Sequence, residues 1–356
     1  MRARADLPYL PSAGYNSGQR GNAGQAVRLG GATAVGIEAV GDRPLDVSVV
    51  VVSYNTAALL RQCLRSILAD PGPSREVLVV DNASTDGSPQ MVADEFPDVR
   101  LITNAGNVGF SRANNQALER SSGRYACLLN SDAELRPGCL AAMVAYLDAH
   151  PRVGVLGPRL VYADGTPQPS RRRFPTLATA FVESTILQRW WPGADVLRRY
   201  YLSDVPDDRP QEVDWVTGAC LMVRREAMAQ VGLLDERFFM YSEELDWCRR
   251  IKAAGWRVAY TPDAVVVHHE SRSAEQNLAR RSILFHDSKC RYFAKYHGPL
   301  WGGILRLFIF LTFVYQYVEE GLKYVLGHRR PLRRQRLAMI REVLGWQARR
   351  LVGLRT

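Results

Sequence analysis

A regular alternation of short apolar runs and helical segments between residues 47 and 149 most strongly constrains the fold. The first run, Val47 to Val52, is almost entirely valine and is bounded by polar turns, the pattern of a strand buried on both faces. The same pattern predicts further strands at 77–80, 99–103 and 125–129, and helices at 57–68, 89–95, 112–120 and 138–149. This succession of strand–helix units predicts a Rossmann-like, mostly parallel sheet, with a ligand crevice at the carboxyl ends of its strands.

The second half of the chain is less regular. Residues 155–162, followed by Ala163–Thr166, predict a strand and a hairpin, and residues 213–223 predict a strand pair around Gly218. We expect helices at 225–231 and 243–254 and short strands at 257–260 and 264–267. Residues 176–212 mix aromatic residues, proline and charge, and their pattern predicts no order of elements.

The composition is that of a folded globular protein, with 47% hydrophobic and 23% charged residues among 356. The net charge of +10 is placed unevenly. Residues 329–356 hold nine arginines against one glutamate, a net charge of +8, so the rest of the chain is nearly neutral. This distribution removes the main electrostatic support for nucleic-acid binding.

The amino-terminal residues 1–44 are rich in Gly, Ala, Arg and Ser without a sustained period, which predicts a disordered leader. No apolar segment follows Arg2 and Arg4, which argues against a signal peptide and against export. The six cysteines form no Cys-x-x-Cys pair, so we expect free thiols in a reducing cytosol.

Residues 304–318 are almost all apolar, although Arg306 interrupts the run and Glu319 and Glu320 close it. The run is shorter than the roughly 20 residues that a membrane span needs. We therefore expect a helix lying in the membrane interface, followed by an arginine-rich tail attracted to anionic lipid. The alternative is a buried core helix with a solvated basic tail.

Polar residues follow two of the predicted strands. Asp81 and Asn82 end the second strand, where a carboxylate can accept hydrogen bonds from a nucleobase or a ribose; a simple turn is the alternative. Asn104–Phe110 follows the third strand and opens a helix. Its glycines permit close backbone approach to a ligand, with a tight structural turn as the alternative.

Asp132 follows the apolar run of the fourth strand, where a diphosphate-bound Mg²⁺ or Mn²⁺ would lie. Helix capping is the alternative role for this side chain. His268 and His269 end a valine-rich strand, and a neutral imidazole there could join the metal.

Glu243 and Glu244 open a predicted helix. Adjacent side chains diverge on a helix, so one glutamate can face the crevice as a base while the other organises the loop. Acidic residues also suit the first turn of any helix because of its dipole. Together with the carboxylate at the strand end, the Glu pair predicts metal-assisted group transfer.

In this order the motifs resemble those of family 2 glycosyltransferases, enzymes with the GT-A fold, and among them the bacterial rhamnosyltransferases. The resemblance covers roughly residues 47–300 and rests on Val52–Asn55, Val79–Asp86, Gly106–Phe110, Leu128–Asp132, Trp215–Gly218, Phe239–Asp246 and His268–His269. It implies a domain over 45–300, with a nucleotide-sugar half (45–150) and an acceptor half (151–300). Residues 301–356 would form a helical, membrane-associating tail.

The resemblance also implies roles for individual residues. Asn130 and Asp132 stand at the family's Asp-x-Asp position, and Glu244 stands at the position of the general base, with Glu243 beside it as its competitor. Asn130 and Glu244 each replace the family's usual Asp. The implied nucleotide-sugar ligands are Ser53, Asn55, Asp81, Asn82, Asn107, Gly109 and Asn130; the metal ligands are Asp132 and His268; the acceptor-side residues are Trp215, Gly218 and Asp246.

The implied reaction is an inverting, metal-dependent transfer of L-rhamnose from dTDP-rhamnose to a lipid-linked or growing surface glycan, with Mg²⁺ or Mn²⁺ as cofactor. A UDP-hexose, UDP-N-acetylhexosamine or UDP-galactofuranose donor is the alternative, and a nucleotide-sugar binding module without turnover is a further one. We expect the protein in the cytoplasm, at the inner face of the cell membrane.

Overall fold

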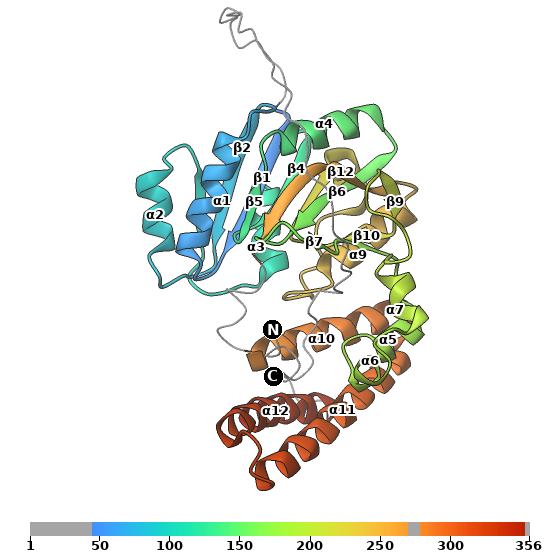
Figure 1. Ribbon diagram of the computed structural model, residues 1–356. Helices are drawn as coiled ribbons and strands as arrows, with labels where there is room; N and C mark the ends of the chain where they lie inside the picture. The colour runs from blue at the N-terminus through green and yellow to red at the C-terminus, as the bar shows by residue number, and fades with distance from the viewer. Residues whose placement is uncertain (1–44, 270–277, 353–356) are drawn as a thin grey trace, which may run out of the picture.

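The computed structural model describes residues 45–269 and 278–352 (Figure 1). The predicted leader, residues 1–44, lies outside the described residues. The predicted mostly parallel sheet is confirmed. Its first half consists of β1 (Val47–Ser53), α1 (Ala57–Ala69), β2 (Arg75–Asp81), α2 (Ser88–Glu95), β3 (Arg100–Thr103), α3 (Phe110–Leu118), β4 (Tyr125–Asn130), β5 (Ala133–Leu135) and α4 (Cys139–Ala149).

The second half completes the sheet and adds helices beneath it in the view of Figure 1. Its strands are β6 (Val153–Val161), β7 (Pro167–Gln168), β8 (Arg171–Arg172), β9 (Gln211–Val213), β10 (Trp215–Val216), β11 (Cys220–Arg224) and β12 (Arg257–His268). Its helices are α5 (Leu177–Val182), α6 (Ile186–Trp190), α7 (Asp195–Tyr200), α8 (Arg225–Val231), α9 (Glu243–Ala253), α10 (Leu278–His297), α11 (Pro299–Val325) and α12 (Arg330–Leu351).

The main sheet has the order β3-β2-β1-β4-β11-β6-β12-β5. Strands β1 to β4 are parallel where they pair, whereas β11 runs antiparallel to both β4 and β6. The register matches Ser53 with Asp81 and Val52 with Asn130. The carboxyl ends of β1, β2 and β4 therefore reach the same edge of the sheet.

Several strands differ from the prediction. β8 was not predicted, and the strands on either side of Gly218 do not pair with each other: β10 pairs with β8, and β11 pairs with β4 and β6. The segments 257–260 and 264–267 form one strand, β12, whose register with β6 shifts between Thr261 and Val265. Strand β5 was not predicted; it pairs antiparallel with the end of β12, which places Ala133 opposite His268. This pairing brings the chain after β4 next to the end of β12.

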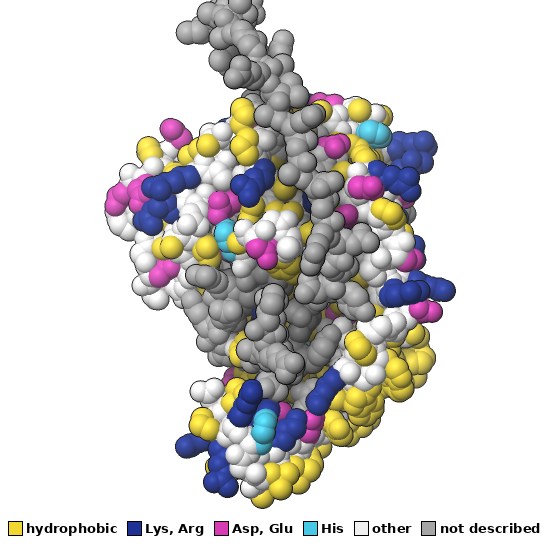
Figure 2. Space-filling model, viewed as in Figure 1, with side chains coloured by type: hydrophobic (Ala, Val, Ile, Leu, Met, Phe, Trp, Pro, Cys, Tyr) yellow, Lys and Arg dark blue, Asp and Glu magenta, His cyan; other side chains and the backbone are white. Residues whose placement is uncertain are grey.

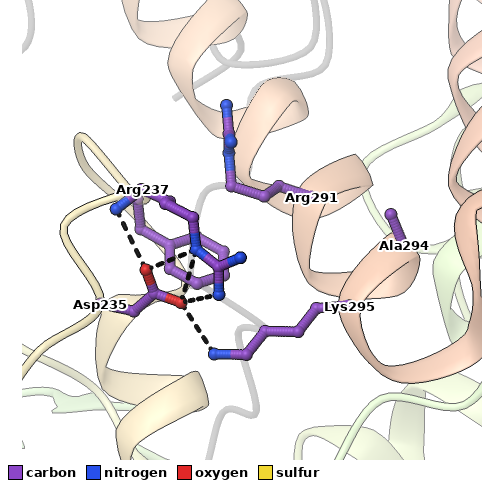
Figure 3. A pocket seen from close by; sticks show the side chains of 6 residues that line it. Asp235, Arg237, Arg291, Ala294 and Lys295 are labelled. Carbon is purple, nitrogen blue, oxygen red and sulfur yellow. Dashed lines mark hydrogen bonds and ion pairs between the residues drawn. The ribbon is translucent and has the colours of Figure 1, made fainter.

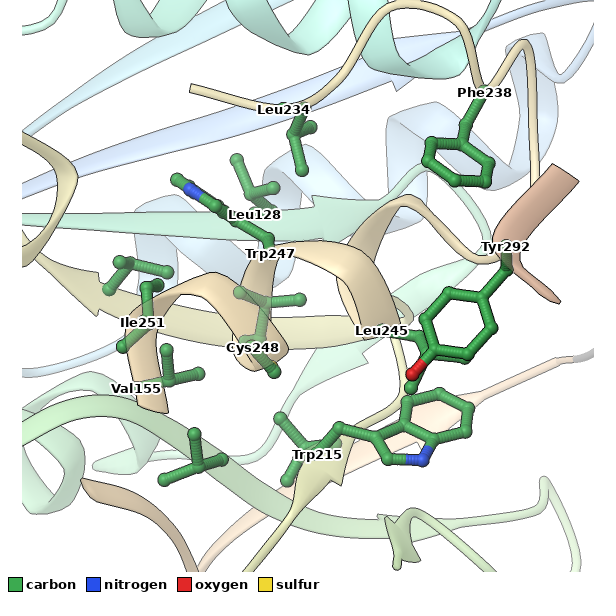
Figure 4. Packing of buried hydrophobic residues seen from close by; sticks show 14 of the residues in the cluster. Leu128, Val155, Trp215, Leu234, Phe238, Leu245, Trp247, Cys248, Ile251 and Tyr292 are labelled. Carbon is green, nitrogen blue, oxygen red and sulfur yellow. The ribbon is translucent and has the colours of Figure 1, made fainter. Parts of the chain in front are cut away.

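Two apolar layers cover the two faces of the sheet. Alternate residues of β1 point to opposite faces, so Val49 and Val51 belong to the layer that includes α1, α2 and α4, whereas Val50 belongs to the layer that includes α3, α9 and the carboxy-terminal helices. Helix α9 contributes Trp247 and Ile251 to the second layer, close to Leu128 of β4 (Figure 4). This packing fixes the position of the amino-terminal end of α9.

The carboxy-terminal tail is helical, as predicted, but its first helix is longer than the apolar run 304–318 and two of its arginines are buried. Helix α11 has 27 residues. Among the described residues it is the single helix whose length and apolar composition would allow it to cross a membrane. The basic tail is not wholly solvated: Arg333 and Arg336 are buried, with Nη1 atoms 2.8 and 3.4 Å from the carboxylate of Glu320 in α11. These ion pairs hold α12 against α11.

We predict that Glu320→Ala lowers the free energy of unfolding by about 3 kcal/mol, because two buried guanidinium groups lose their carboxylate partner. Urea denaturation followed by circular dichroism measures this change. Glu342→Ala, which removes an exposed carboxylate from α12, is the matched control and should change stability by less than about 0.5 kcal/mol. Equal effects of the two substitutions would contradict a structural role for the buried pairs.

Candidate active site

The loops after β1 and β2 are tied together at the carboxyl edge of the sheet. Ser53 is buried, and its hydroxyl lies 3.0 Å from that of Thr56, which donates to Ser131 after β4. Asn55 has a positive φ of 53°, and its Oδ1 accepts from the backbone N–H of Thr85 at 2.7 Å. These two predicted nucleotide-sugar ligands therefore make contacts that shape the edge.

Asp81 is buried at the end of β2 and is only partly satisfied. Its Oδ2 accepts a hydrogen bond from the backbone N–H of Ser84 at 2.8 Å. Its Oδ1 is buried and has no hydrogen-bond partner among the described residues. A buried carboxylate oxygen without a partner costs free energy unless a ligand supplies a donor. Asp81 is thus the strongest candidate at this edge for a hydrogen bond to a nucleobase or a ribose.

The Asn107–Gly109 loop packs against the protein. Asn82 donates to the carbonyl of Gly109 at 3.3 Å, and Asn107 Oδ1 accepts from the N–H of Gly109 at 3.0 Å. Gly109 has a φ of +92°, and a Cβ there would lie 2.8 Å from Phe239. Gly109 therefore allows a close approach of the backbone to the loop before α9.

Asp132 and His268 meet where β5 pairs with β12. Asp132 Oδ1 lies 3.3 Å from His268 Nε2, and the other ring nitrogen of His268 lies 2.9 Å from Gln168 Oε1. Burial alone would raise the pKa of Asp132, but hydrogen bonding to His268 and its charge lower that pKa below its ordinary value. Asn130 Nδ2 lies 3.4 Å from His268 Nε2, so three predicted ligands converge here.

This pair fits a divalent cation that is held mainly by a diphosphate. Among the described residues no group of three or more His, Cys, Asp and Glu side chains could hold a metal ion. Mg²⁺ sites typically use one or two protein carboxylates together with substrate phosphates and water. Gln168, which no sequence motif indicated, orients the His268 ring so that Nε2 faces Asp132. His269 is held separately by Glu134.

The Glu pair, Glu243 and Glu244, lies at the start of α9, after Tyr241 and Ser242 with φ of 70° and 66°. Gly218 donates its backbone N–H to Glu244 Oε1 at 3.3 Å. The neighbouring residue Ala219 accepts from the backbone N–H of Asn130, which places the Glu pair beside the end of β4. The Oε2 atoms of both glutamates are buried without a hydrogen-bond partner in the described ranges.

Burial perturbs both carboxyl groups of the Glu pair. Burial, and then the charge of Glu244, raise the pKa of Glu243 well above its ordinary value. Burial also raises the pKa of Glu244, partly offset by backbone hydrogen bonds that include the one from Gly218. Buried acids with raised pKa values next to a polar strand edge are typical of sites for acid–base chemistry.

Two predicted acceptor-side residues, Asp246 and Trp215, make extensive contacts within the protein. Asp246 is fully buried, and its carboxylate binds Arg250 at 2.9 Å, Tyr296 at 2.7 Å and Lys295. Both of its carboxylate oxygens are engaged in these contacts, and those with Tyr296 and Lys295 fasten α9 to α10. Trp215 lies in the apolar core with an exposed fraction of 7%, and its Nε1 donates to the carbonyl of Arg173. Gly218, the third predicted acceptor-side residue, contacts Glu244.

A cavity of about 390 Å³ lies outside this site, between the turn before α9 and α10 (Figure 3). Its lining includes Asp235, whose carboxylate is paired with Arg237 at 2.6 Å and with Lys295 at 2.8 Å. Arg291, also in the lining, binds Asp287 at 3.2 Å, and no predicted site residue lines the cavity.

Comparison with known proteins identifies the family to which the chain belongs. The family model described as glycosyl transferase family 2 matches residues 48–232. An N-acetylglucosaminyl-diphospho-decaprenol L-rhamnosyltransferase from Mycobacterium tuberculosis is 33% identical over 270 residues, 72% of this chain and 87% of that protein. The succinoglycan biosynthesis protein ExoO from Rhizobium meliloti is 36% identical over 157 residues, 42% of this chain and 45% of that protein.

Among solved structures, a mannosyltransferase from Pyrobaculum calidifontis in complex with GDP-Man and Mn²⁺ has a similar fold. The TM-score is 0.51 and the sequence identity 19%, with 88% of each chain covered. The sheet, its polar edge and these similarities together define a glycosyltransferase with a GT-A fold. The chain belongs to glycosyl transferase family 2, as its motifs predicted.

We predict that Glu243→Gln stabilises the protein at neutral and alkaline pH by about 1 kcal/mol or more. The raised pKa of Glu243 means that the folded state binds its proton more tightly than the unfolded state does. Its contribution to stability is therefore present in acid and is lost as pH rises through the folded pKa. Urea unfolding at pH 5, 7 and 8 should show an advantage of the Gln variant that grows with pH.

Glu226→Gln is the control for that substitution, since Glu226 is an exposed acid in the first turn of α8. Its unfolding free energy should show no such growth with pH. The interpretation fails if Glu243→Gln destabilises the protein equally at every pH.

Proposed function

We propose that the chain is an inverting, metal-dependent glycosyltransferase that moves L-rhamnose from dTDP-rhamnose to a lipid-linked or growing cell-surface glycan. The observation that carries the proposal is the convergence of Asp81, the Asp132–His268 pair and the Glu pair on one edge of the sheet. The similarity to the mycobacterial L-rhamnosyltransferase supports the sugar and the acceptor class. Residues 45–150 would bind the nucleotide-sugar, and residues 151–300 would form the acceptor half.

The donor would be held along the strand ends. The unpaired Oδ1 of Asp81 would accept a hydrogen bond from the base or the ribose. Asp132 and His268 would hold Mg²⁺ or Mn²⁺ together with the diphosphate, an assignment supported by the Mn²⁺ named with the mannosyltransferase. Such a metal supplies positive charge that stabilises a leaving diphosphate. Asn130 lies beside this pair and would contact the sugar diphosphate.

Glu244 would act as the general base. The N–H of Gly218 holds its Oε1, and Oε2 would take the proton of the acceptor hydroxyl as that oxygen attacks the anomeric carbon. Attack from the face opposite the nucleotide breaks the bond to the diphosphate in one displacement, and the anomeric carbon inverts. The raised pKa of Glu244 makes its ionised form a stronger base.

Peripheral contact with the cytoplasmic face of the membrane belongs to the same proposal. One side of α11 packs on α10 and α12, and the other side is exposed. None of the exposed residues of α11 carries a charge: Pro299, Leu300, Trp301, Gly303, Ile304, Leu307, Leu311, Val314, Tyr315, Tyr317, Val318, Leu322, Tyr324 and Val325. A one-sided apolar helix of this kind fits the interface of a bilayer.

A panel of nucleotide-sugars tests the proposed function. The protein is incubated with dTDP-rhamnose, UDP-glucose, UDP-N-acetylglucosamine or UDP-galactofuranose, with Mn²⁺ or Mg²⁺ and a polyprenyl-diphosphate-linked acceptor, and release of nucleoside diphosphate is measured. Turnover that is highest with dTDP-rhamnose supports the proposal. Turnover with a UDP-sugar alone supports the alternative donor. Binding of a nucleotide-sugar without release in any mixture indicates a binding module.

We predict that Asp132→Ala abolishes turnover and leaves the fold intact, because it removes a metal ligand rather than a core contact. Calorimetric titration with the nucleoside diphosphate, with and without Mn²⁺, gives a second measurement: the variant should lose the Mn²⁺-dependent part of the affinity. Glu134→Gln, two residues along the chain, is the control and should keep it. A variant with near-normal rate and metal dependence would show that Asp132 has only a structural role.

We predict that Glu244→Gln lowers the turnover rate by roughly a hundredfold or more, because the amide cannot accept the proton. Nucleotide-sugar affinity should survive, since the donor contacts lie at the strand ends. Glu243→Gln should reduce turnover less, through the order of the turn and placement of the acceptor. Rates and donor affinities of both variants decide the assignment, and a greater loss at Glu243 would reverse it.

A further inference from the structure

Two exposed tryptophans extend the apolar surface beyond α11. Trp190 ends α6 and Trp191 follows it, with exposed fractions of 52% and 60%. Large aromatic side chains are rarely this exposed without a partner, and adjacent ones form a contiguous patch. Figure 2 shows hydrophobic atoms gathered along the lower right side of the molecule, over α11.

Helix α6 is fastened to α11 by specific contacts. Arg189 makes two hydrogen bonds to the carboxylate of Glu319, at 2.6 and 2.7 Å. The Trp190 ring meets that of Tyr315 edge to face, with centroids 5.9 Å apart. Phe181 of α5 packs in the same way on Phe308, at 5.2 Å. The tryptophans thus hold a fixed position beside the exposed face of α11.

The exposed charges of the neighbouring helix α12 favour an anionic bilayer over a second copy of the chain. Helix α12, which packs on α11, exposes Arg330, Arg334, Arg341 and Arg349 against the single exposed acid Glu342. Two copies that paired through α11 would each carry this excess of positive charge and repel one another, whereas an anionic surface attracts it. Tryptophan and tyrosine also prefer the boundary between headgroups and acyl chains.

We infer that Trp190 and Trp191 form, with the exposed face of α11, one membrane-docking surface, and that the tryptophans set the orientation of the catalytic domain over the bilayer. The inference rests on the proposed function in taking a lipid-linked acceptor as the substrate. The α5–α6 segment follows β8, which pairs with Trp215 and Val216 of β10, and β10 ends two residues before Gly218. The tryptophan anchor is therefore close in the chain to the strands that support the acceptor side.

The test compares Trp190→Ala/Trp191→Ala with the intact chain for binding to vesicles of phosphatidylcholine, with and without one quarter phosphatidylglycerol. We expect the double substitution to weaken binding to the anionic vesicles about tenfold or more, through loss of the buried aromatic area. Trp190→Phe/Trp191→Phe should restore most of the affinity. Leu68→Ala, at an exposed apolar position on α1, is the control and should bind as the intact chain does.

Transfer assays separate this inference from the proposed function. The alanine variant should keep its rate with a short-chain, water-soluble acceptor and lose rate with a polyprenyl-linked acceptor in vesicles. Vesicle binding uses no sugar, so an intact chain that transfers no sugar would refute the proposed function and leave the docking result standing. Wild-type vesicle affinity in the alanine variant would overturn the inference. Sedimentation could also overturn it: the intact chain would be a dimer, the alanine substitutions would dissociate that dimer, and vesicle binding would be unchanged.

Discussion

The parallel register of β1 with β2 and β4 is the constraint on which the site depends. It aligns Ser53 with Asp81 and Val52 with Asn130, so three polar strand ends meet at one edge. Both faces of these strands are buried, and a slip by one residue would exchange the two apolar layers. Core packing far from the edge therefore decides where Asp81 and Asp132 lie.

Helix α9 buries three carboxylates within its first turn, and these carboxylates have different partners. Asp246 is neutralised by Arg250 and Lys295, whereas the Glu pair is held by backbone hydrogen bonds that include the one from Gly218. Burying carboxyl groups in this way costs free energy, which the packing of Trp247 and the fastening of α9 to α10 offset. A raised pKa in such a setting is the property that a general base needs.

The sequence pattern predicted those site residues whose positions depend on the strand or helix in which they lie. Asp81 and Asp132 follow apolar strands and the Glu pair opens a helix, so each position could be predicted from its neighbours. The role of Gln168 could not be predicted, because Gln168 and its partner His268 are 100 residues apart in the sequence. The close approach of Gly109 to Phe239 likewise depends on tertiary packing, and the short helices α5 to α7 have too few turns for a clear period.

Helix α10 joins the catalytic turn to the apolar surface. Three consecutive residues in it hold three different elements: Asp287 binds Arg306 of α11, Ser288 donates to the carbonyl of Met240, and Lys289 binds Glu183 at the end of α5. Met240 immediately precedes the turn that presents the Glu pair. Because packed interiors transmit displacement rather than absorb it, the distance between the Glu pair and the exposed face of α11 is set by the fold itself, not by a flexible linker.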